Sequence, residues 1–163
     1  MPNYKIYIEN RYESWKLFKD DTFDEVSYDF DPLKSKLFSD DVFNNDNDIV
    51  KIVHSTTRNL KYIPGVLILN KNKTYGKKKN KFLYKCVPDD IRLPIFLVSY
   101  EIKQTSFSKK QENKYITFNF ENWDNVHPVG TIVNTIGDVD KLENFYEYQL
   151  YCKSLNSSIQ KFS

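Results

Sequence analysis

Most of the chain shows the residue patterns of β-strands. Successive side chains of a strand point to opposite faces, so alternating apolar and polar residues mark a strand with one buried face. The segments that alternate, or that form a short apolar run between turn residues, are Tyr4–Ile8, Trp15–Phe18, Ile49–Val53, Gly65–Leu69, Phe82–Val87, Pro94–Tyr100, Lys114–Phe120 and Gly130–Ile136. We interpret Ile49–Val53 as a buried strand.

The remaining segments have less regular patterns. Apolar residues recur every two to three positions in Asp20–Asp31, which indicates an irregular strand. Those of Leu37–Phe43 fit one side of a short helical turn, and Asn44–Asp48 is predicted to be a loop. Val139–Ile159 is rich in helix formers and predicts a terminal helix, although Tyr146–Tyr151 also alternates and leaves a strand open.

The strands predict a mainly β protein with an OB-fold. Five of them fall within about 75 residues, and a small closed barrel of five strands, a fold that binds oligonucleotides, is the natural candidate. A β-sandwich is the alternative. We therefore divide the chain into an acidic, partial OB-like β domain (1–57), an OB-fold domain (58–139), and a C-terminal helical segment or linker (140–163).

Charge is distributed unevenly along the chain. The net charge of the 163 residues is only +2, yet 20–48 holds ten acidic residues against two lysines, and 51–114 holds fifteen basic residues against four acidic ones. The basic part can attract nucleic acid. In the alternative interpretation the acidic half of one copy docks on the basic half of another, and the protein is a self-association or protein–protein module without a nucleic-acid role.

Other classes of function find no support in the sequence. No apolar run approaches the ~20 residues of a membrane span, and the N-terminus lacks the apolar core of a signal peptide. Cys86 and Cys152 are too few for a disulfide framework and indicate a reducing, cytoplasmic compartment. Neither histidine lies at ligand spacing from a cysteine, so we expect no metal, and no nucleophile–base pair or Walker motif is present.

The most informative segment is Lys71–Lys81. It holds six lysines in eleven residues around Gly76, which we expect to adopt a positive φ, and aromatic-bearing strands follow it. Such a loop can hold a phosphate backbone while rings stack bases, and a loop lets the consecutive Lys77, Lys78 and Lys79 all reach phosphates. The residues predicted to bind single-stranded RNA are Lys71, Lys73, Tyr75, Lys77, Lys78, Lys79, Lys81, Tyr84, Arg92 and Trp123.

These residues also have structural explanations. The lysines would keep a hairpin tip soluble. Tyr84 and Phe82 share one face of a strand, and we expect Tyr84, which has a polar tip, at the surface and Phe82 in the core. Arg92 is favoured to pair with the neighbouring aspartates over phosphate. Trp123 lies in a polar turn, where it either stacks a nucleotide or closes the end of the barrel.

Two segments carry a recognisable pattern. Within Asn119–Asp138 the pattern consists of Trp123, Pro128, Gly130, Ile132, Ile136 and Gly137, and further upstream it consists of Pro88, Asp90, Arg92 and Pro94. Both resemble the second cold-shock (OB) domain of the ribonuclease II / ribonuclease R / exosome exoribonuclease family. The resemblance covers Ile63–Leu155. A fainter similarity to the first cold-shock domain, over Tyr4–Val53, consists of Lys34, Lys36, Asp41 and Val42.

The resemblance implies the RNA-guiding part of a 3′–5′ exoribonuclease. In that family a catalytic domain with a magnesium-binding aspartate cluster follows the barrels, and no such cluster occurs in these 163 residues. We therefore expect no catalytic residues and no cofactor here, with magnesium only if a catalytic domain follows. The predicted partner is single-stranded RNA.

Overall fold

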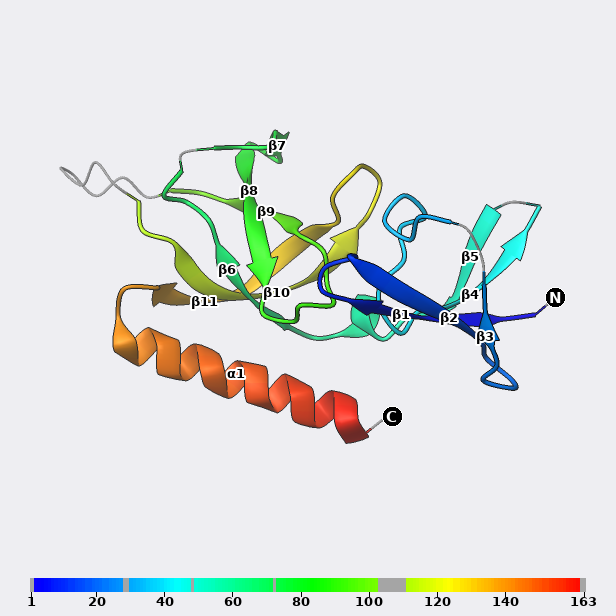
Figure 1. Cartoon of the computed structure of the whole chain (residues 1–163). Helices are drawn as coiled ribbons and strands as arrows, with labels where there is room; N and C mark the ends of the chain where they lie inside the picture. Colours follow the sequence, from blue (N-terminus) through cyan, green and yellow to red (C-terminus); the bar gives the residue numbers. More distant parts are fainter. Residues whose placement is uncertain (1, 28–29, 48, 72, 103–110, 162–163) are drawn as a thin grey trace. The chain divides into compact units, whose positions relative to one another are not determined.

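The structure, a computed structural model, describes residues 2–27, 30–47, 49–71, 73–102 and 111–161. It confirms a mainly β protein with a C-terminal helix, α1 (Leu142–Lys161) (Figure 1). The chain folds into two compact units: unit 1 comprises Met1–Leu60 and Asp90–Pro94, and unit 2 comprises Lys61–Asp89 and Ile95–Ser163. No helix among the described residues is long and apolar enough to cross a membrane.

Unit 2 contains a closed five-stranded barrel (Figure 1). Its strands are β6 (Ile63–Leu67), β8 (Lys81–Pro88), β9 (Phe96–Tyr100), β10 (Lys114–Asn122) and β11 (Val129–Asp138), and the short β7 (Lys77–Lys78) pairs with β8. The order around the barrel is β6–β8–β9–β11–β10 and back to β6, with every pairing antiparallel except the parallel β9–β11 pairing. The predicted OB-fold is confirmed, and the alternative sandwich is excluded because the sheet closes on itself.

The barrel closes around packed aromatic rings. Phe96 and Phe118 are fully buried and meet edge to face, with ring centroids 4.9 Å apart. Gly130 lies directly against this pair, because a Cβ added there would lie 2.7 Å from Cδ2 of Phe118 and 2.8 Å from the carbonyl oxygen of Asn119. A close-packed ring and a strand backbone have little room to move, so only glycine fits at this position.

Helix α1 packs against β6, β10 and β11 of the same unit. Its buried side includes Tyr148 and Cys152, and the Tyr148 ring stacks on Tyr115 with centroids 4.5 Å apart. The predicted terminal helix is therefore confirmed, and the alternative strand over Tyr146–Tyr151 is wrong. The alternation there does not reflect burial, because Tyr146 and Leu150 are 60% and 66% exposed whereas Tyr148 is 4% exposed.

Unit 1 contains an open antiparallel sheet with the order β3-β2-β1-β4-β5. Its strands are β1 (Tyr4–Glu9), β2 (Ser14–Lys19), β3 (Glu25–Val26), β4 (Val42–Asp46) and β5 (Ile49–His54), and the short 3-10 helix η1 (Thr57–Asn59) follows. If the five barrel strands of unit 2 are numbered 1 to 5 along the chain, their order around the barrel is 1-2-3-5-4. Opening that barrel between strands 3 and 5 gives the order 3-2-1-4-5, which is the order of the sheet in unit 1. The core of this unit is formed by Ile6, Ile8, Leu17, Leu37 and Phe43.

Two of the irregular segments in unit 1 were predicted wrongly. Val42 and Phe43 belong to strand β4 and to no helical turn, and β4 continues into the predicted loop as far as Asp46. The chain reverses directly after this strand, at Asn47, whose φ of 51° is tolerated by asparagine. Cross-strand pairing with β5 thus overrides the turn preference of the asparagines.

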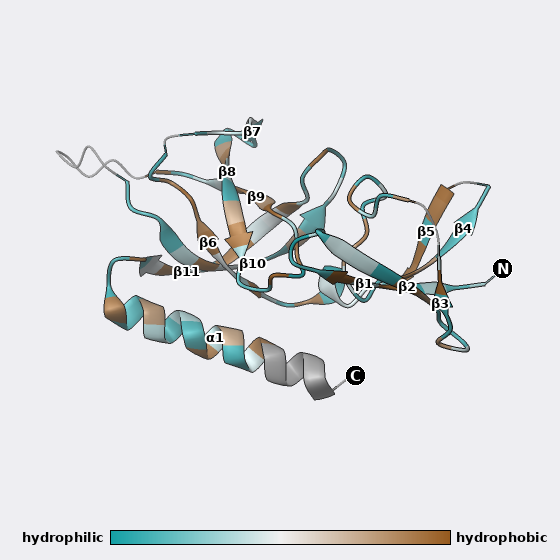
Figure 2. Ribbon diagram, viewed as in Figure 1, coloured by the Kyte–Doolittle hydropathy of each residue, from teal (hydrophilic) through white to brown (hydrophobic). Residues whose placement is uncertain are grey.

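The remaining differences concern the edges of this sheet. Within Asp20–Asp31 the described residues form only the two-residue strand β3. Ile49–Val53 is a strand, β5, but it lies at the sheet edge, and Ile49 and Val53 are 67% and 53% exposed. Figure 2 shows β5 as a hydrophobic strand. An apolar run therefore indicated the strand correctly but did not indicate burial.

Candidate nucleic-acid interface

The lysine-rich segment forms the loop between the first and second strands of the barrel, β6 and β8. Its two ends are fixed to β8, because the Ile68 amide donates to the Lys85 carbonyl and the Tyr75 amide to the Leu83 carbonyl, at 2.9 and 2.8 Å. Gly76 has a φ of 112°, as predicted. OB-folds bind oligonucleotides with this loop, the loop between the fourth and fifth strands, and the face of the second and third strands.

The tip of this loop is a tight hairpin formed by β7 and the start of β8. Lys77 pairs with Phe82 and Lys78 with Lys81, while Lys79 and Asn80 turn the chain with φ values of 50° and 68°. Positive φ at both central residues is the signature of a two-residue hairpin turn. The segment is therefore partly a strand, and neighbouring side chains point in opposite directions.

The three consecutive lysines consequently do not act alike. The Lys78 ammonium pairs with the Glu121 carboxylate at the end of β10, and burial lowers its pKa. The Lys77 ammonium lies over the Phe82 ring, 4.8 Å from the centroid. The expectation that Lys77, Lys78 and Lys79 all reach phosphates from a loop is thus corrected, because Lys78 is on a strand and already has an anionic partner.

One aromatic contact joins this loop to the β10–β11 loop. The Tyr75 ring meets the His127 ring edge to face, with centroids 6.2 Å apart, and the Lys73 ammonium lies 5.2 Å from the centroid of the same tyrosine. His127 lies between β10 and β11, the fourth and fifth strands of the barrel. The two loops that OB-folds use for oligonucleotides therefore touch each other in this protein.

The comparison with protein families agrees with this geometry. Residues 83–148 match the family model described as Dis3-like cold-shock domain 2. Over these residues the barrel is similar to the cold-shock OB domains of the ribonuclease II / ribonuclease R / Dis3 family. No curated protein matches the chain. The matched residues include both motifs that carry the resemblance to the second cold-shock domain. The fainter similarity of Tyr4–Val53 to the first cold-shock domain lies outside the match and stays a prediction.

The family supports an RNA-binding module in general. In the cold-shock domain, Lys71, Lys73, Tyr75, Lys77, Lys79 and Lys81 are brought together on the β6–β8 loop and its hairpin. Sequence reasoning missed three residues beside them, which are Phe82, Lys85 and His127. No local signal identifies His127, because only the tertiary fold places it against Tyr75.

Two predicted aromatic residues are not available for stacking. Tyr84 is only 5% exposed, whereas Phe82 is 43% exposed, so the expected exposures of these two rings are reversed. Trp123 is buried, and its indole N–H donates to the Val126 carbonyl at 3.3 Å within the β10–β11 loop. Trp123 therefore closes the end of the cold-shock domain, which is the structural alternative considered above.

Arg92 is engaged in ion pairs with two aspartates. It belongs to unit 1, where its guanidinium bonds Asp90 at 2.9 Å and Asp40 at 3.2 Å. The hydrogen bond with Asp90 is the largest of the effects that raise the pKa of Arg92. The structural role is thus the one observed, and phosphate would have to displace two carboxylates.

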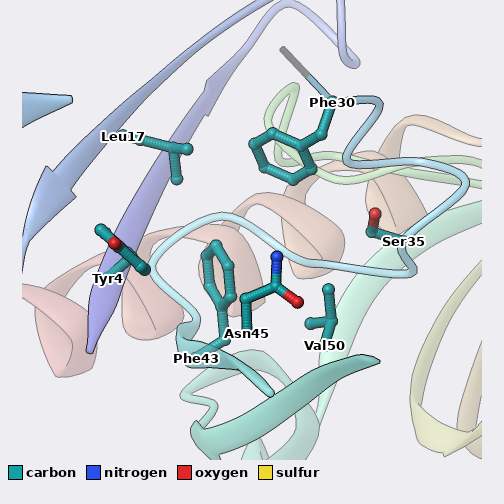
Figure 3. Close-up of a pocket in the computed structure, with 7 residues that line it drawn as sticks. All are labelled: Tyr4, Leu17, Phe30, Ser35, Phe43, Asn45 and Val50. Atoms are coloured by element: carbon teal, nitrogen blue, oxygen red, sulfur yellow. The ribbon is translucent and has the colours of Figure 1, made fainter. Parts of the chain in front are cut away.

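Unit 1 contains a different kind of hollow, an apolar cavity of about 220 Å³ (Figure 3). The side chains that surround it are Tyr4, Leu17, Phe30, Ser35, Phe43, Asn45 and Val50. No lysine or arginine is among the described residues that line it. This cavity therefore lacks the positive charge that a phosphate backbone requires, and the candidate interface belongs to the cold-shock domain.

Proposed function

We propose that the cold-shock domain binds single-stranded RNA around its lysine-rich loop, through a set of residues here called the RNA face. It consists of Lys71, Lys73, Tyr75, Lys77, Lys79, Lys81, Phe82, Lys85 and His127. One observation carries the proposal: the lysine cluster lies on the β6–β8 loop and meets the β10–β11 loop through Tyr75 and His127. Both loops are oligonucleotide-binding elements of OB-folds.

The RNA face combines the two interactions that single strands need. The lysine ammonium groups neutralise phosphates, which supplies affinity without sequence preference. Phe82 is 43% exposed, and Tyr75 is half-buried, so both offer ring surface to unpaired bases. Each stacked base contributes about 1–3 kcal/mol. Duplex RNA keeps its bases inside the helix and cannot use these rings.

The similarity to this family suggests where the bound RNA strand would go. We infer that the bound strand is passed to a 3′–5′ exoribonuclease centre in a further domain, where magnesium would be held by that domain's aspartates. The chain itself then serves as an RNA guide, and its own residues perform no catalysis. The resemblance to the ribonuclease II / ribonuclease R / Dis3 family supports this role.

Binding of a single strand and of a duplex tests the proposal directly. Fluorescence anisotropy would measure the affinity of the full chain for an internally labelled 12-nucleotide RNA, alone and annealed to its complement, at 100 mM salt. We expect at least roughly tenfold tighter binding of the single strand, because only it can stack on Phe82 and Tyr75. No binding at 50 mM salt, or equal affinity for both RNAs, would refute the proposal.

A matched pair of variants separates ring stacking from general hydrophobicity. Phe82→Leu keeps an apolar side chain and removes the ring, and should weaken single-strand binding roughly five- to a hundredfold. Tyr146→Leu removes a 60% exposed ring from α1, outside the RNA face, and should change nothing. Equal effects of the two substitutions would show that Phe82 does not stack bases.

The uneven charge also supports a second candidate, self-association through acidic and basic halves. Light scattering at 50 and 500 mM salt distinguishes it, because a dimer held by exposed charges comes apart as salt screens them. If the protein is instead monomeric at low salt and binds RNA, this candidate fails.

A further inference from the structure

A hollow of about 480 Å³ lies beneath the lysine-rich loop, between it and β8. The residues that line it are Ile68, Asn70, Lys71, Lys73, Tyr75, Lys85, Val87 and Asn113. Tyr84 and Cys86 point into the barrel core, so the alternating Lys85 and Val87 lie on the outer side of β8. The hollow is thus next to the strand face that OB-folds use for ligands.

The wall of this hollow is held in place by hydrogen bonds. The side-chain oxygen Oδ1 of Asn113 accepts from the backbone amides of Leu69 and Asn70, at 2.9 and 3.0 Å. The Ile68 amide donates to the Lys85 carbonyl on one side and the Tyr75 amide to the Leu83 carbonyl on the other. The loop is therefore anchored at three points around the hollow.

Three lysines give the hollow its charge. Lys71 and Lys73 come from the loop and Lys85 from the strand, and no acidic side chain is among the described residues that line the hollow. Lys73 holds its ammonium over the Tyr75 ring, 5.2 Å from the centroid, so the charge and an aromatic surface lie together. Ile68 and Val87 supply apolar surface beside them.

We propose that this hollow binds the terminal phosphate of an RNA strand, a phosphate monoester, with the last nucleotide against Tyr75. The proposal rests on the proposed function, because it assigns one end of the bound strand to one part of the RNA face. A phosphate monoester carries a charge of about −1.5 to −2 at pH 7, whereas an internal diester carries −1. Three ammonium groups around one hollow match the larger charge, and charge-assisted hydrogen bonds to phosphate oxygens are the strong ones.

The test compares three 12-nucleotide RNAs that differ only at their ends. They carry hydroxyls at both ends, a 5′-phosphate, or a 3′-phosphate, and anisotropy of an internal label measures their affinity for the full chain at 100 mM salt. We expect one of the phosphorylated strands to bind about fivefold tighter than the hydroxyl strand, the effect of a charge-assisted contact in a partly exposed site. The strand that gains identifies which end occupies the hollow.

Two lysines of the same strand provide the matched variants. Lys85→Gln removes a lining charge, and should reduce the gain from the terminal phosphate to less than about twofold. Lys81→Gln removes a charge of β8 that does not line the hollow, and should weaken the phosphorylated and hydroxyl strands equally. A gain that survives Lys85→Gln would place the terminal phosphate elsewhere and overturn the assignment.

The outcomes separate this inference from the proposed function. If the hydroxyl strand binds and neither phosphate improves its affinity, the terminal-phosphate site is refuted while RNA binding stands. If no strand binds, both are refuted. Inorganic phosphate at 10 mM serves as a further probe, because a real monoester site should let it compete away the gain of the phosphorylated strand while leaving the hydroxyl strand bound.

Discussion

The ion pair of Lys78 makes two adjacent lysines respond differently to RNA. Lys77 and Lys78 both lie on β7, but Lys78 pairs with Glu121, whereas the Lys77 ammonium lies over the Phe82 ring. The perturbation is the substitution of each lysine by glutamine. We expect Lys77→Gln to lower the salt dependence of RNA binding, and Lys78→Gln to leave it unchanged, because Lys78 already has a carboxylate partner.

The size of the effect follows from counterion release. Each phosphate neutralised on a single strand contributes about 0.7 to the slope of log affinity against log salt, so the six lysines of the RNA face give a slope of about −4.2. These six are Lys71, Lys73, Lys77, Lys79, Lys81 and Lys85. Between 50 and 200 mM salt, a fourfold change, the wild-type affinity should fall roughly 300-fold, and Lys77→Gln should reduce this loss about 2.5-fold.

The assay is the anisotropy titration of the 12-nucleotide single strand at 50, 100 and 200 mM salt. Glu121→Gln provides a third arm: it releases Lys78 to the RNA while retaining an oxygen that can accept from Thr131 as Glu121 does. This variant should steepen the slope by up to about 0.7. Equal slopes for Lys77→Gln and Lys78→Gln, or a wild-type slope near zero, would refute the reasoning.

Three further predictions test the fold around this surface. Gly130→Ala should lower the free energy of unfolding, measured in urea, by about 1–3 kcal/mol, because the added Cβ would clash with Phe118 and a backbone oxygen. Thr135→Ala, at an exposed position of the same strand, should change it by no more than about 0.5 kcal/mol. Burial raises the pKa of Asp41 from 3.8 to about 6, so the folded protein holds this proton more tightly than the unfolded chain does. The stability that this group contributes is therefore lost as pH rises from about 4 to 6. Relative to Asp41→Asn, the free energy of unfolding of the wild type should fall by about 3 kcal/mol across that range, as followed by Trp15 fluorescence in a Trp123→Phe background. Burial also raises the pKa of the Cys152 thiol to about 12, so native protein should resist a thiol reagent at pH 8 that labels unfolded protein rapidly; fast native labelling would contradict this.

The barrel was predictable from sequence because its signals are local. Alternation and the bounding prolines and glycines mark each strand of unit 2 to within a few residues, and five short strands with a long basic connection indicate an OB-fold. In unit 1 the same reasoning failed at β4, where pairing with β5 draws asparagines into a strand. These two strands are consecutive in the chain, so the error came from reading the whole Asn- and Asp-rich segment as a loop, whereas Asn44–Asp46 pair with β5.

Exposure was the least predictable property. Phe82 and Tyr84 lie on the same face of β8, as predicted, but Phe82 pairs with Tyr100 at the end of the strand and next to β7, beyond the buried part of the barrel. Which of two like-facing rings is buried depends on how far the strand extends past the core. The polar tip of Tyr84 was therefore a poor guide to its position.

The candidate site was predictable in part. The lysine cluster is visible as local composition, and its position between the first two barrel strands follows once the fold is assigned. The pairing of Lys78 with Glu121 and the contact of Tyr75 with His127 depend on tertiary structure and have no spacing signal. The same holds for Arg92, whose partner Asp40 is 52 positions away in the chain.

Photocrosslinking tests the central claim most directly, because it reports where the RNA lies. A 12-nucleotide single strand containing 4-thiouridine would be bound to the full chain, irradiated, and the modified peptides located by mass spectrometry. We predict adducts within 71–85 and at His127, on the RNA face of the cold-shock domain. Adducts confined to unit 1 or to α1 would contradict the account.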